Sequence, residues 1–193
     1  MAKLYFHYAT MNAGKSTMLL QASYNYRERG MRTVIFIAAL DERAGKGRVA
    51  SRIGLSSDAI PFHAGDDLFA EIEAMHGHEP IACVFVDEAQ FLSPAQVWQL
   101  ARVSDRIGIP VMAYGLRTDF QGKLFPGSHE LLAIADELRE VRTICHCGRK
   151  ATMVVRVGAD GAVVREGAQV EVGGNDRYVS LCRRHWEDKM DGG

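Results

Sequence analysis

The feature that most constrains this chain is the segment ATMNAGKS, residues 9–16. It follows an apolar run over residues 4–8 and precedes residues 16–29, where apolar residues recur at helical spacing. A strand, a tight loop ending in Gly-Lys-Ser and a helix form a cradle for nucleotide phosphates, because backbone N–H groups and the helix N-terminus offer positive charge there. We therefore predict that Lys15 reaches the β- and γ-phosphates and that the Ser16 hydroxyl binds Mg²⁺.

The segment departs from the pattern G-x-x-x-x-G-K-[ST] at its first position, where Ala9 replaces glycine. Alanine adds only a β-carbon, so the loop keeps its shape if the φ angle at residue 9 is negative. The alternative is a Gly-Lys-Ser tripeptide that occurs by chance. The flanking strand and helix favour the phosphate loop, as does a second motif farther along the chain.

The second motif is the apolar run IACVFV, residues 81–86, followed by Asp87 and Glu88. An apolar strand that ends in aspartate delivers a carboxylate to the Mg²⁺ ion held by Ser16. The neighbouring Glu88 then has two possible roles. It is either a general base that takes a proton from the attacking hydroxyl or water, or a group that orients the ligands of the metal. The alternative for both residues is a pair of solvated acids.

Apolar runs and helical patterns alternate as far as residue 144, which predicts an α/β fold. Strands are predicted at residues 33–39, 81–86, 110–114 and 138–144, and helices at 68–75, 93–106 and 128–135. This order favours a P-loop, RecA-like parallel sheet with helices on both faces and ligands at the C-terminal ends of its strands. Residues 41–57 are polar and glycine-containing, so we expect a mobile loop whose arginines are either solvated or in contact with phosphate.

The pattern changes after Cys145. A glycine-containing turn at residues 158–161 separates short β-type runs at 154–157 and 163–165, which predicts a hairpin. A further strand is expected at residues 178–181 and a final helix at 183–190. We therefore predict two domains, a nucleotide-binding α/β domain over residues 1–144 and a small β lobe over residues 145–193.

This lobe holds the side chains for a metal site. Three thiolates and one imidazole make a tetrahedral Zn²⁺ set, supplied here by Cys145, Cys147, Cys182 and His185. Zinc would be structural, since a lobe of this size has little core of its own. His146 competes with His185 as a ligand, although its place between two cysteine ligands makes reaching the same ion awkward. The alternative is a set of reduced cysteines packed in a core.

Composition limits the partners and the compartment. A formal net charge of −1 gives no basic surplus, which argues against duplex DNA or an acidic membrane as the main partner. No apolar run approaches the roughly 20 residues of a membrane span, and no signal peptide is recognisable. The cysteine pattern favours a metal site over disulfides, so we expect a cytoplasmic protein.

Several segments together resemble a known family. They are MNAGKS (residues 11–16), VDEAQF (86–91), YGLRTDF (114–120) and GGNDRY (173–178), together with the two cysteine pairs. In order and spacing they resemble the zinc-containing type II thymidine kinases, in their enterobacterial-like form, over nearly the whole chain. Relatives of this form share a small residue other than glycine at position 9, and many relatives have cysteine where this chain has His185.

The resemblance implies an activity and a set of partners. Members of this family transfer the γ-phosphate of ATP to the 5′-hydroxyl of thymidine, giving dTMP and ADP, as part of pyrimidine deoxynucleoside salvage and DNA precursor synthesis. They combine an α/β phosphate-loop domain with a zinc lobe, whose lasso loop closes over the base. They are homotetramers inhibited by dTTP. We therefore expect a homotetramer, dTTP as feedback inhibitor, and neither nucleic acid nor membrane as partner.

The resemblance also assigns roles by position. Glu88 would be the catalytic base. ATP and Mg²⁺ would be held by Ala9, Thr10, Met11, Asn12, Ala13, Gly14, Lys15, Ser16, Asp87, Glu88, Ala89 and Gln90. Thymidine would be bound by Met11, Asp41, Arg43, Phe91, Leu116, Phe120, Phe125 and Tyr178. Single aromatic residues usually belong to a core, but several beside loops near a phosphate site suit a flat nucleobase. The zinc ligands would be Cys145, Cys147, Cys182 and His185.

Two other classes of protein share parts of the pattern. The tetrapeptide at residues 87–90, Asp-Glu-Ala-Gln, resembles the D-E-x-x box of DNA-stimulated ATPases, but the chain has only one motor-sized domain and no basic surplus. A nucleotide-sensing protein without turnover would keep Lys15 and Asp87 but would not need Glu88 as a base.

Overall fold

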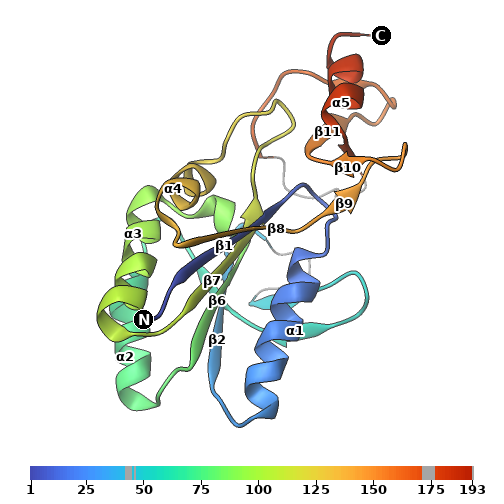
Figure 1. The fold of residues 1–193 in the computed structure, drawn as a ribbon. Helices are drawn as coiled ribbons and strands as arrows, with labels where there is room; N and C mark the ends of the chain where they lie inside the picture. The colour runs from blue at the N-terminus through green and yellow to red at the C-terminus, as the bar shows by residue number, and fades with distance from the viewer. Residues whose placement is uncertain (42–44, 46, 171–176, 193) are drawn as a thin grey trace.

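The computed structural model describes residues 1–41, 45, 47–170 and 177–192, and Arg43 and most of the expected lasso segment lie outside this part of the chain. A parallel sheet with helices on both faces carries a small β lobe beside it (Figure 1). The strand order is β5-β2-β6-β7-β1-β8. The strands are β1 (Leu4–Ala9), β2 (Thr33–Ala38), β5 (Ile60–Phe62), β6 (Cys83–Asp87), β7 (Val111–Leu116) and β8 (Glu137–Glu140). The predicted fold class is confirmed.

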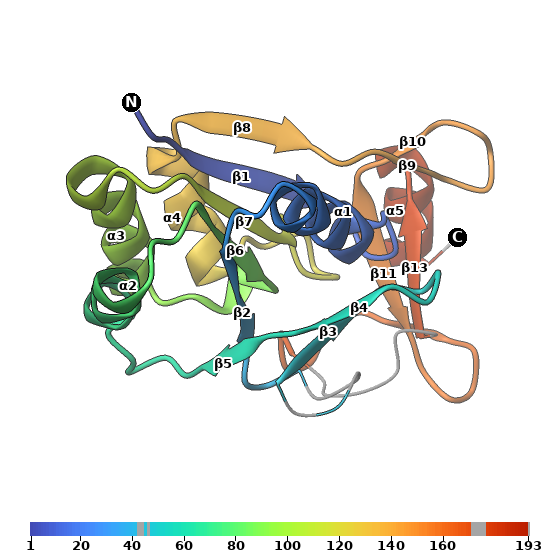
Figure 2. The same ribbon diagram turned by 90° about the horizontal axis from the view of Figure 1, so that it is seen from below.

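Alternate residues of the central strands point to opposite faces of this sheet. Phe36 and Val86 belong to a core beneath α2 (Leu68–His78), α3 (Pro94–Arg102) and α4 (Pro126–Ile134). Ile35 and Phe85 belong to a second core beneath α1 (Lys15–Glu28). The end-on view in Figure 2 shows α1 on one side of the sheet and the other three helices on the opposite side. Burial on both faces explains why these strands read as continuous apolar runs.

Helix α3 shows how local sequence sets an element's ends. Ser93 Oγ accepts a hydrogen bond from the Gln96 backbone N–H at 3.3 Å, and Gln96 Oε1 accepts one from the Ser93 N–H at 3.0 Å. This capping box, with Pro94 at the first helical position, fixes the predicted start. The helix continues into a π-helical turn, Val103–Ile107, and ends at Gly108, whose φ of 80° suits glycine.

The segment expected to be a mobile loop, residues 41–57, contains ordered structure. Strands β3 (Arg48–Ala50) and β4 (Ser56–Asp58) pair antiparallel and form a hairpin, in which Val49 is buried in the core under α1. The expectation of a loop was therefore wrong for this part of the segment. The strands are short and mostly polar, so they carry no apolar alternation that a sequence pattern could reveal.

The strand predicted over residues 138–144 is divided in two. The first part is β8, and the second is β9 (Thr143–Ile144), which pairs antiparallel with β10 (Lys150–Ala151). Between them the Val141 N–H donates to the Tyr8 carbonyl at 2.9 Å, at the edge of the large sheet. The turn that joins β9 to β10 contains Cys145 and Cys147. The domain division at residue 144 stays a prediction.

The rest of the lobe follows the sequence closely. Strands β11 (Met153–Val157), β12 (Val163–Val164) and β13 (Tyr178–Leu181) form an antiparallel sheet with β11 in the centre, and α5 (Arg183–Met190) follows. The predicted hairpin, last strand and last helix are confirmed. Across the described ranges, no helix has the length and apolarity needed to cross a membrane.

Candidate active site

The loop between β1 and α1 is wound tightly at its centre. Asn12 has a φ of 62° and Gly14 a φ of 86°, both in the left-handed region. Glycine suits position 14 because a β-carbon is strained in that region. Ala9 ends β1 and pairs with Leu116, and its φ is not positive. The condition under which alanine can replace the first glycine is therefore met.

The loop and the acidic motif meet at the C-terminal edge of the sheet. The Ser16 hydroxyl donates to Asp87 Oδ2 at 2.8 Å, although the two residues are 71 positions apart. Lys15 folds back over the loop, and its Nζ donates to the Thr10 carbonyl at 3.2 Å. The structure thus brings together a lysine, a hydroxyl and a carboxylate, the groups that a Mg²⁺-bound triphosphate requires.

The Asp87 carboxyl group is almost fully buried. Burial, and after it the negative charge of Glu88, raise the pKa of Asp87 to about 7, against a smaller opposing effect of the Ser16 hydrogen bond. A buried carboxylate is costly unless a positive charge compensates it. Carboxylate and hydroxyl oxygens side by side are ligands that Mg²⁺ prefers, so this donor pair fits the ion.

Glu88 is held in a defined orientation by Gln90. Its backbone lies in the left-handed region with a φ of 53°, and its side chain accepts a hydrogen bond from Gln90 Nε2. Gln90 is buried, and its Oε1 accepts from the Leu116 N–H at 3.0 Å. At Gly115 an added β-carbon would lie 2.9 Å from the Gln90 backbone nitrogen, so glycine allows β7 to approach this turn. Gln90 therefore links Glu88 to the neighbouring strand.

A pocket of about 410 Å³ opens in front of these groups. Its floor is the phosphate loop with Asp87 and Glu88, and the β3–β4 hairpin contributes Arg48 and Arg52. Of the residues expected to bind thymidine, this lining includes Met11, Asp41 and Leu116. The two arginines belong to the set that the sequence left open between solvent and phosphate.

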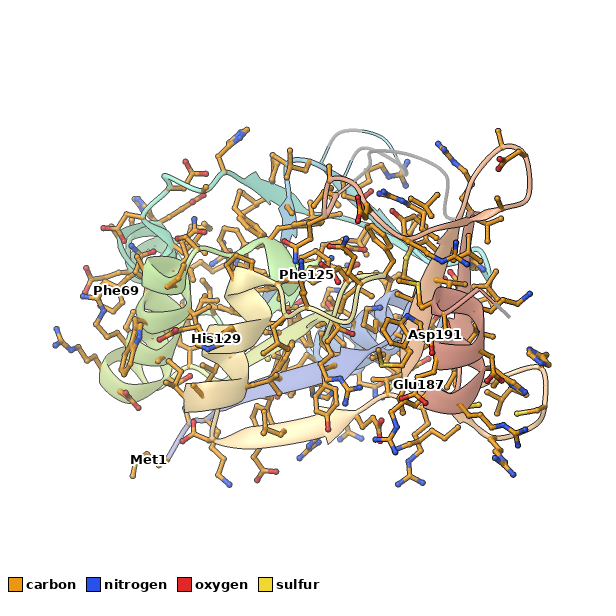
Figure 3. All side chains as sticks on the ribbon, turned by 90° about the horizontal axis from the view of Figure 1, so that it is seen from above. Met1, Phe69, Phe125, His129, Glu187 and Asp191 are labelled. Carbon is orange, nitrogen blue, oxygen red and sulfur yellow. The ribbon has the colours of Figure 1, made fainter. Side chains whose placement is uncertain are left out.

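The expected aromatic residues lie deeper in the protein. Phe120 and Phe125 are 1% and 4% exposed, and Phe125 packs edge-on against Phe91 with ring centroids 5.9 Å apart. Figure 3 shows Phe125 where the loop enters α4. The Arg156 guanidinium from the lobe lies 4.0 Å from the centre of the Phe120 ring. Tyr178 is half-buried at the start of β13. The three phenylalanines and Tyr178 are outside the described lining of the 410 Å³ pocket.

The four predicted zinc ligands form one cluster. Their ligand atoms all lie within 4.8 Å of one another. The His185 Nδ1 atom is 3.3 Å from Cys145 Sγ and 3.5 Å from Cys182 Sγ, and the sulfurs of Cys147 and Cys182 are 3.9 Å apart. A tetrahedral Zn²⁺ ion with ordinary bond lengths places sulfurs about 3.8 Å apart and sulfur and nitrogen about 3.5 Å apart. The donor set and its spacing therefore fit zinc.

Electrostatics favour the same reading. Burial opposes charge on the Cys145 sulfur, but the backbone N–H groups of Cys147 and Cys182, with His185, outweigh it and lower the pKa of Cys145 to about 5. None of the cysteines forms a disulfide. The ring of His146 stacks on that of His185 with centroids 4.3 Å apart, and His146 is not part of the four-ligand cluster. Between the two histidines, the geometry favours His185.

The family model and the curated relatives point to one family. The family model described as "Thymidine kinase" matches residues 2–186. A thymidine kinase of Rhizobium meliloti (strain 1021) is 76% identical over 192 residues, which cover 98% of each chain. A thymidine kinase of Agrobacterium fabrum (strain C58) is 75% identical over 191 residues, which cover 99% of each chain. A crystal structure of Pif1 helicase from Candida albicans is 14% identical, with a TM-score of 0.45 over 74% of this chain and 36% of that one, a similarity too low to support a conclusion.

Proposed function

The chain belongs to the thymidine kinase family, and on that premise we propose how its residues transfer the γ-phosphate of ATP to the 5′-hydroxyl of thymidine. The observation that carries the proposal is the hydrogen bond from Ser16 to Asp87 beside Glu88. It joins the phosphate loop to the acidic end of β6 within one pocket. Phosphoryl transfer depends mainly on such positioning and on neutralising charge.

The phosphates of ATP occupy the loop over residues 9–16. Its N–H groups and the N-terminus of α1 face them, and Lys15 moves from the Thr10 carbonyl to the β- and γ-phosphates. Ser16 and Asp87 hold Mg²⁺, which neutralises phosphate charge when bound. The rest of the proposed ATP site is formed by Thr10, Met11, Asn12, Ala13, Glu88, Ala89 and Gln90.

Glu88 acts as the general base. The 5′-hydroxyl oxygen of thymidine forms a bond to the γ-phosphorus, its proton passes to Glu88, and the bond to the β-phosphate oxygen breaks to release ADP. Gln90 holds the Glu88 carboxylate in one orientation, which lowers the entropic cost of reaching the reactive geometry.

The β3–β4 hairpin adds positive charge to the phosphate side. Arg48 donates to the Ser56 hydroxyl at 3.1 Å across the hairpin, and both Arg48 and Arg52 line the pocket that contains Lys15. Guanidinium groups suit phosphate oxygens because they donate two parallel hydrogen bonds. We assign both arginines to the triphosphate or to the group in transfer.

Thymidine binds between this pocket and the lobe. Met11, Asp41 and Leu116 line the pocket, and we assign the apolar part of the thymidine site to Phe91, Phe120 and Phe125, of which Phe91 and Phe125 pack edge-on against each other. Tyr178 approaches from β13, and Arg43 completes the proposed set outside the described residues. A site built to hydrogen-bond a pyrimidine leaves those groups unpaired when a purine enters, which gives selectivity.

The remaining family properties are proposals for this chain. Residues 145–193 form a lobe held by a structural Zn²⁺ ion, on the basis of the four-ligand cluster. The homotetramer, inhibition by dTTP and a cytoplasmic location rest on the family resemblance. Light scattering of the purified protein and dTTP titration of its activity test the first two.

One assay separates kinase, DNA-stimulated ATPase and sensor. ADP production is measured with thymidine, with single-stranded DNA and with neither. We expect stimulation by thymidine alone. Glu88→Gln should lower kcat by about 10²–10⁴-fold, the usual value of general base catalysis, while ATP binding persists. Turnover that depends on DNA, or an unchanged rate in Glu88→Gln, would contradict the proposal.

A further inference from the structure

One hydrogen bond connects the lobe directly to the phosphate loop. The Ser180 hydroxyl on β13 donates to the Met11 carbonyl at 2.6 Å, across 169 positions of sequence. The Thr10 hydroxyl donates to the same carbonyl at a longer 3.4 Å. Ser180 is two residues before Cys182, one of the four clustered metal ligands. The contact therefore joins the loop to the strand that leads into the metal cluster.

The two faces of strand β13 contact different parts of the molecule. Leu181 packs with Cys145 and Cys182 in the core of the lobe. Ser180 points the opposite way, and Tyr178 shares its face because side chains alternate along a strand. Arg156 lies opposite Tyr178 in the register of β11, and its guanidinium reaches the Phe120 ring of the large domain. This second face of the lobe sheet thus meets the nucleotide-binding domain.

The orientation of the Met11 carbonyl determines the orientation of the next backbone N–H group, that of Asn12. It belongs to the peptide bond that precedes Asn12, whose φ of 62° is unusual for a residue other than glycine. In a trans peptide the C=O and N–H point in opposite directions. A donor that fixes the Met11 carbonyl on the side of the lobe therefore fixes the Asn12 N–H on the side that faces away from the lobe.

We propose that Ser180 is a positioning residue for ATP, which holds the Met11–Asn12 peptide in the orientation that presents the Asn12 N–H to phosphate. The lobe thereby supports the nucleotide site through β13, in addition to its expected role over thymidine. This inference rests on the proposal that residues 9–16 bind the phosphates of ATP.

The test compares the effect of one variant on the KM for ATP with its effect on the KM for thymidine. Ser180→Ala should raise the KM for ATP by about three- to tenfold, the value of one hydrogen bond, and leave the KM for thymidine within about twofold. Ser180→Thr keeps a hydroxyl and should restore the KM for ATP. Zinc content and the Tm of the purified variants should match those of the unaltered protein.

A matched control removes another bond between the lobe and the large domain. Gln121 Nε2 donates to the Arg165 carbonyl at 3.1 Å, and neither residue is in the described lining of the 410 Å³ pocket, so Gln121→Ala should leave the KM for ATP unchanged. An unchanged KM for ATP in Ser180→Ala would overturn the inference, as would equal rises in both KM values together with lost zinc. Lys15→Ala separates the two levels: if it leaves ATP binding intact, the phosphate-loop proposal itself fails.

Discussion

The two parts of this molecule are held together by different forces. In the large domain, β2, β6 and β7 are buried on both faces, and the site forms where their C-terminal ends meet the phosphate loop. The lobe has a small apolar core around Val155 and Leu181, and beside it lies the cluster of three cysteines and one histidine that could hold a metal ion. Burial of apolar surface dominates stability in the first region. In the second region, we propose that bonds to a Zn²⁺ ion supply most of the stability. We therefore expect that each region can be destabilised by substitutions that leave the other region folded.

Loss of a zinc ligand should have the largest effect. Cys182→Ser removes one thiolate, and structural zinc sites supply folding energy of about 10 kcal/mol or more. We expect the variant to lose zinc, to become sensitive to protease within residues 145–193, and to lose most activity, while residues 1–144 stay folded. Elemental analysis and limited proteolysis measure this. Cys83→Ser, at the cysteine outside the cluster, should keep its zinc; a metal-free protein with an intact lobe would refute the zinc assignment.

Loss of a large core residue should produce the opposite pattern. Phe85 lies on β6 and is fully buried beneath α1. Phe85→Ala should therefore lower the free energy of unfolding by about 3–5 kcal/mol. Zinc content should stay at one ion per folded chain. Trp98→Phe, at a half-exposed position, is the control and should change stability little. Chemical denaturation followed by circular dichroism measures both, and loss of zinc in Phe85→Ala would mean that the two regions fold as one unit.

Removal of Gln90 should affect the reaction more than the fold. Gln90→Ala removes one hydrogen bond from the Glu88 side chain and one from the Leu116 N–H, so kcat should fall by about ten- to a hundredfold. The exposed Gln21, which pairs with Asn25 on α1, provides a matched control in Gln21→Ala. Steady-state kinetics with thymidine and ATP measure the change. A kcat equal to that of the control would show that Glu88 does not depend on Gln90.

The same contrast explains what the sequence could predict. Continuous apolar strands and the Gly14-Lys15-Ser16 and Asp87-Glu88 motifs predicted the sheet and the meeting of loop and carboxylate. Cysteine spacing predicted the cluster that ties β9–β10 to α5. The β3–β4 hairpin was not predicted because its residues are mostly polar. The position of its arginines could not be derived from a sequence pattern either. The contact from Ser180 to Met11 escaped too, because a lone serine in a strand carries no signal of its distant partner.

A buried histidine under the phosphate loop gives the smallest expected effect. His7 on β1 stacks on Tyr114 with ring centroids 4.3 Å apart, and neither ring nitrogen has a hydrogen-bond partner among the described residues. Burial, with Arg139 nearby, lowers the pKa of His7 to about 4 from its ordinary 6.5. The unfolded chain therefore binds a proton between these values while the folded chain does not, so stability present above pH 6.5 is lost as the pH falls toward 4.

His7→Phe should remove that dependence, because phenylalanine keeps a ring in the stack and has no proton to gain. Stability of the unaltered protein should decline by about 1–2 kcal/mol between pH 7 and pH 5 relative to the variant. Denaturant unfolding at several pH values gives the comparison, and equal slopes in the two proteins would show that His7 does not govern it. Zinc release on acidification follows the lobe, so metal content measured in the same samples keeps the two effects apart. A slope that disappears in His7→Phe at constant zinc then belongs to the strand beneath the phosphate loop and not to the metal cluster.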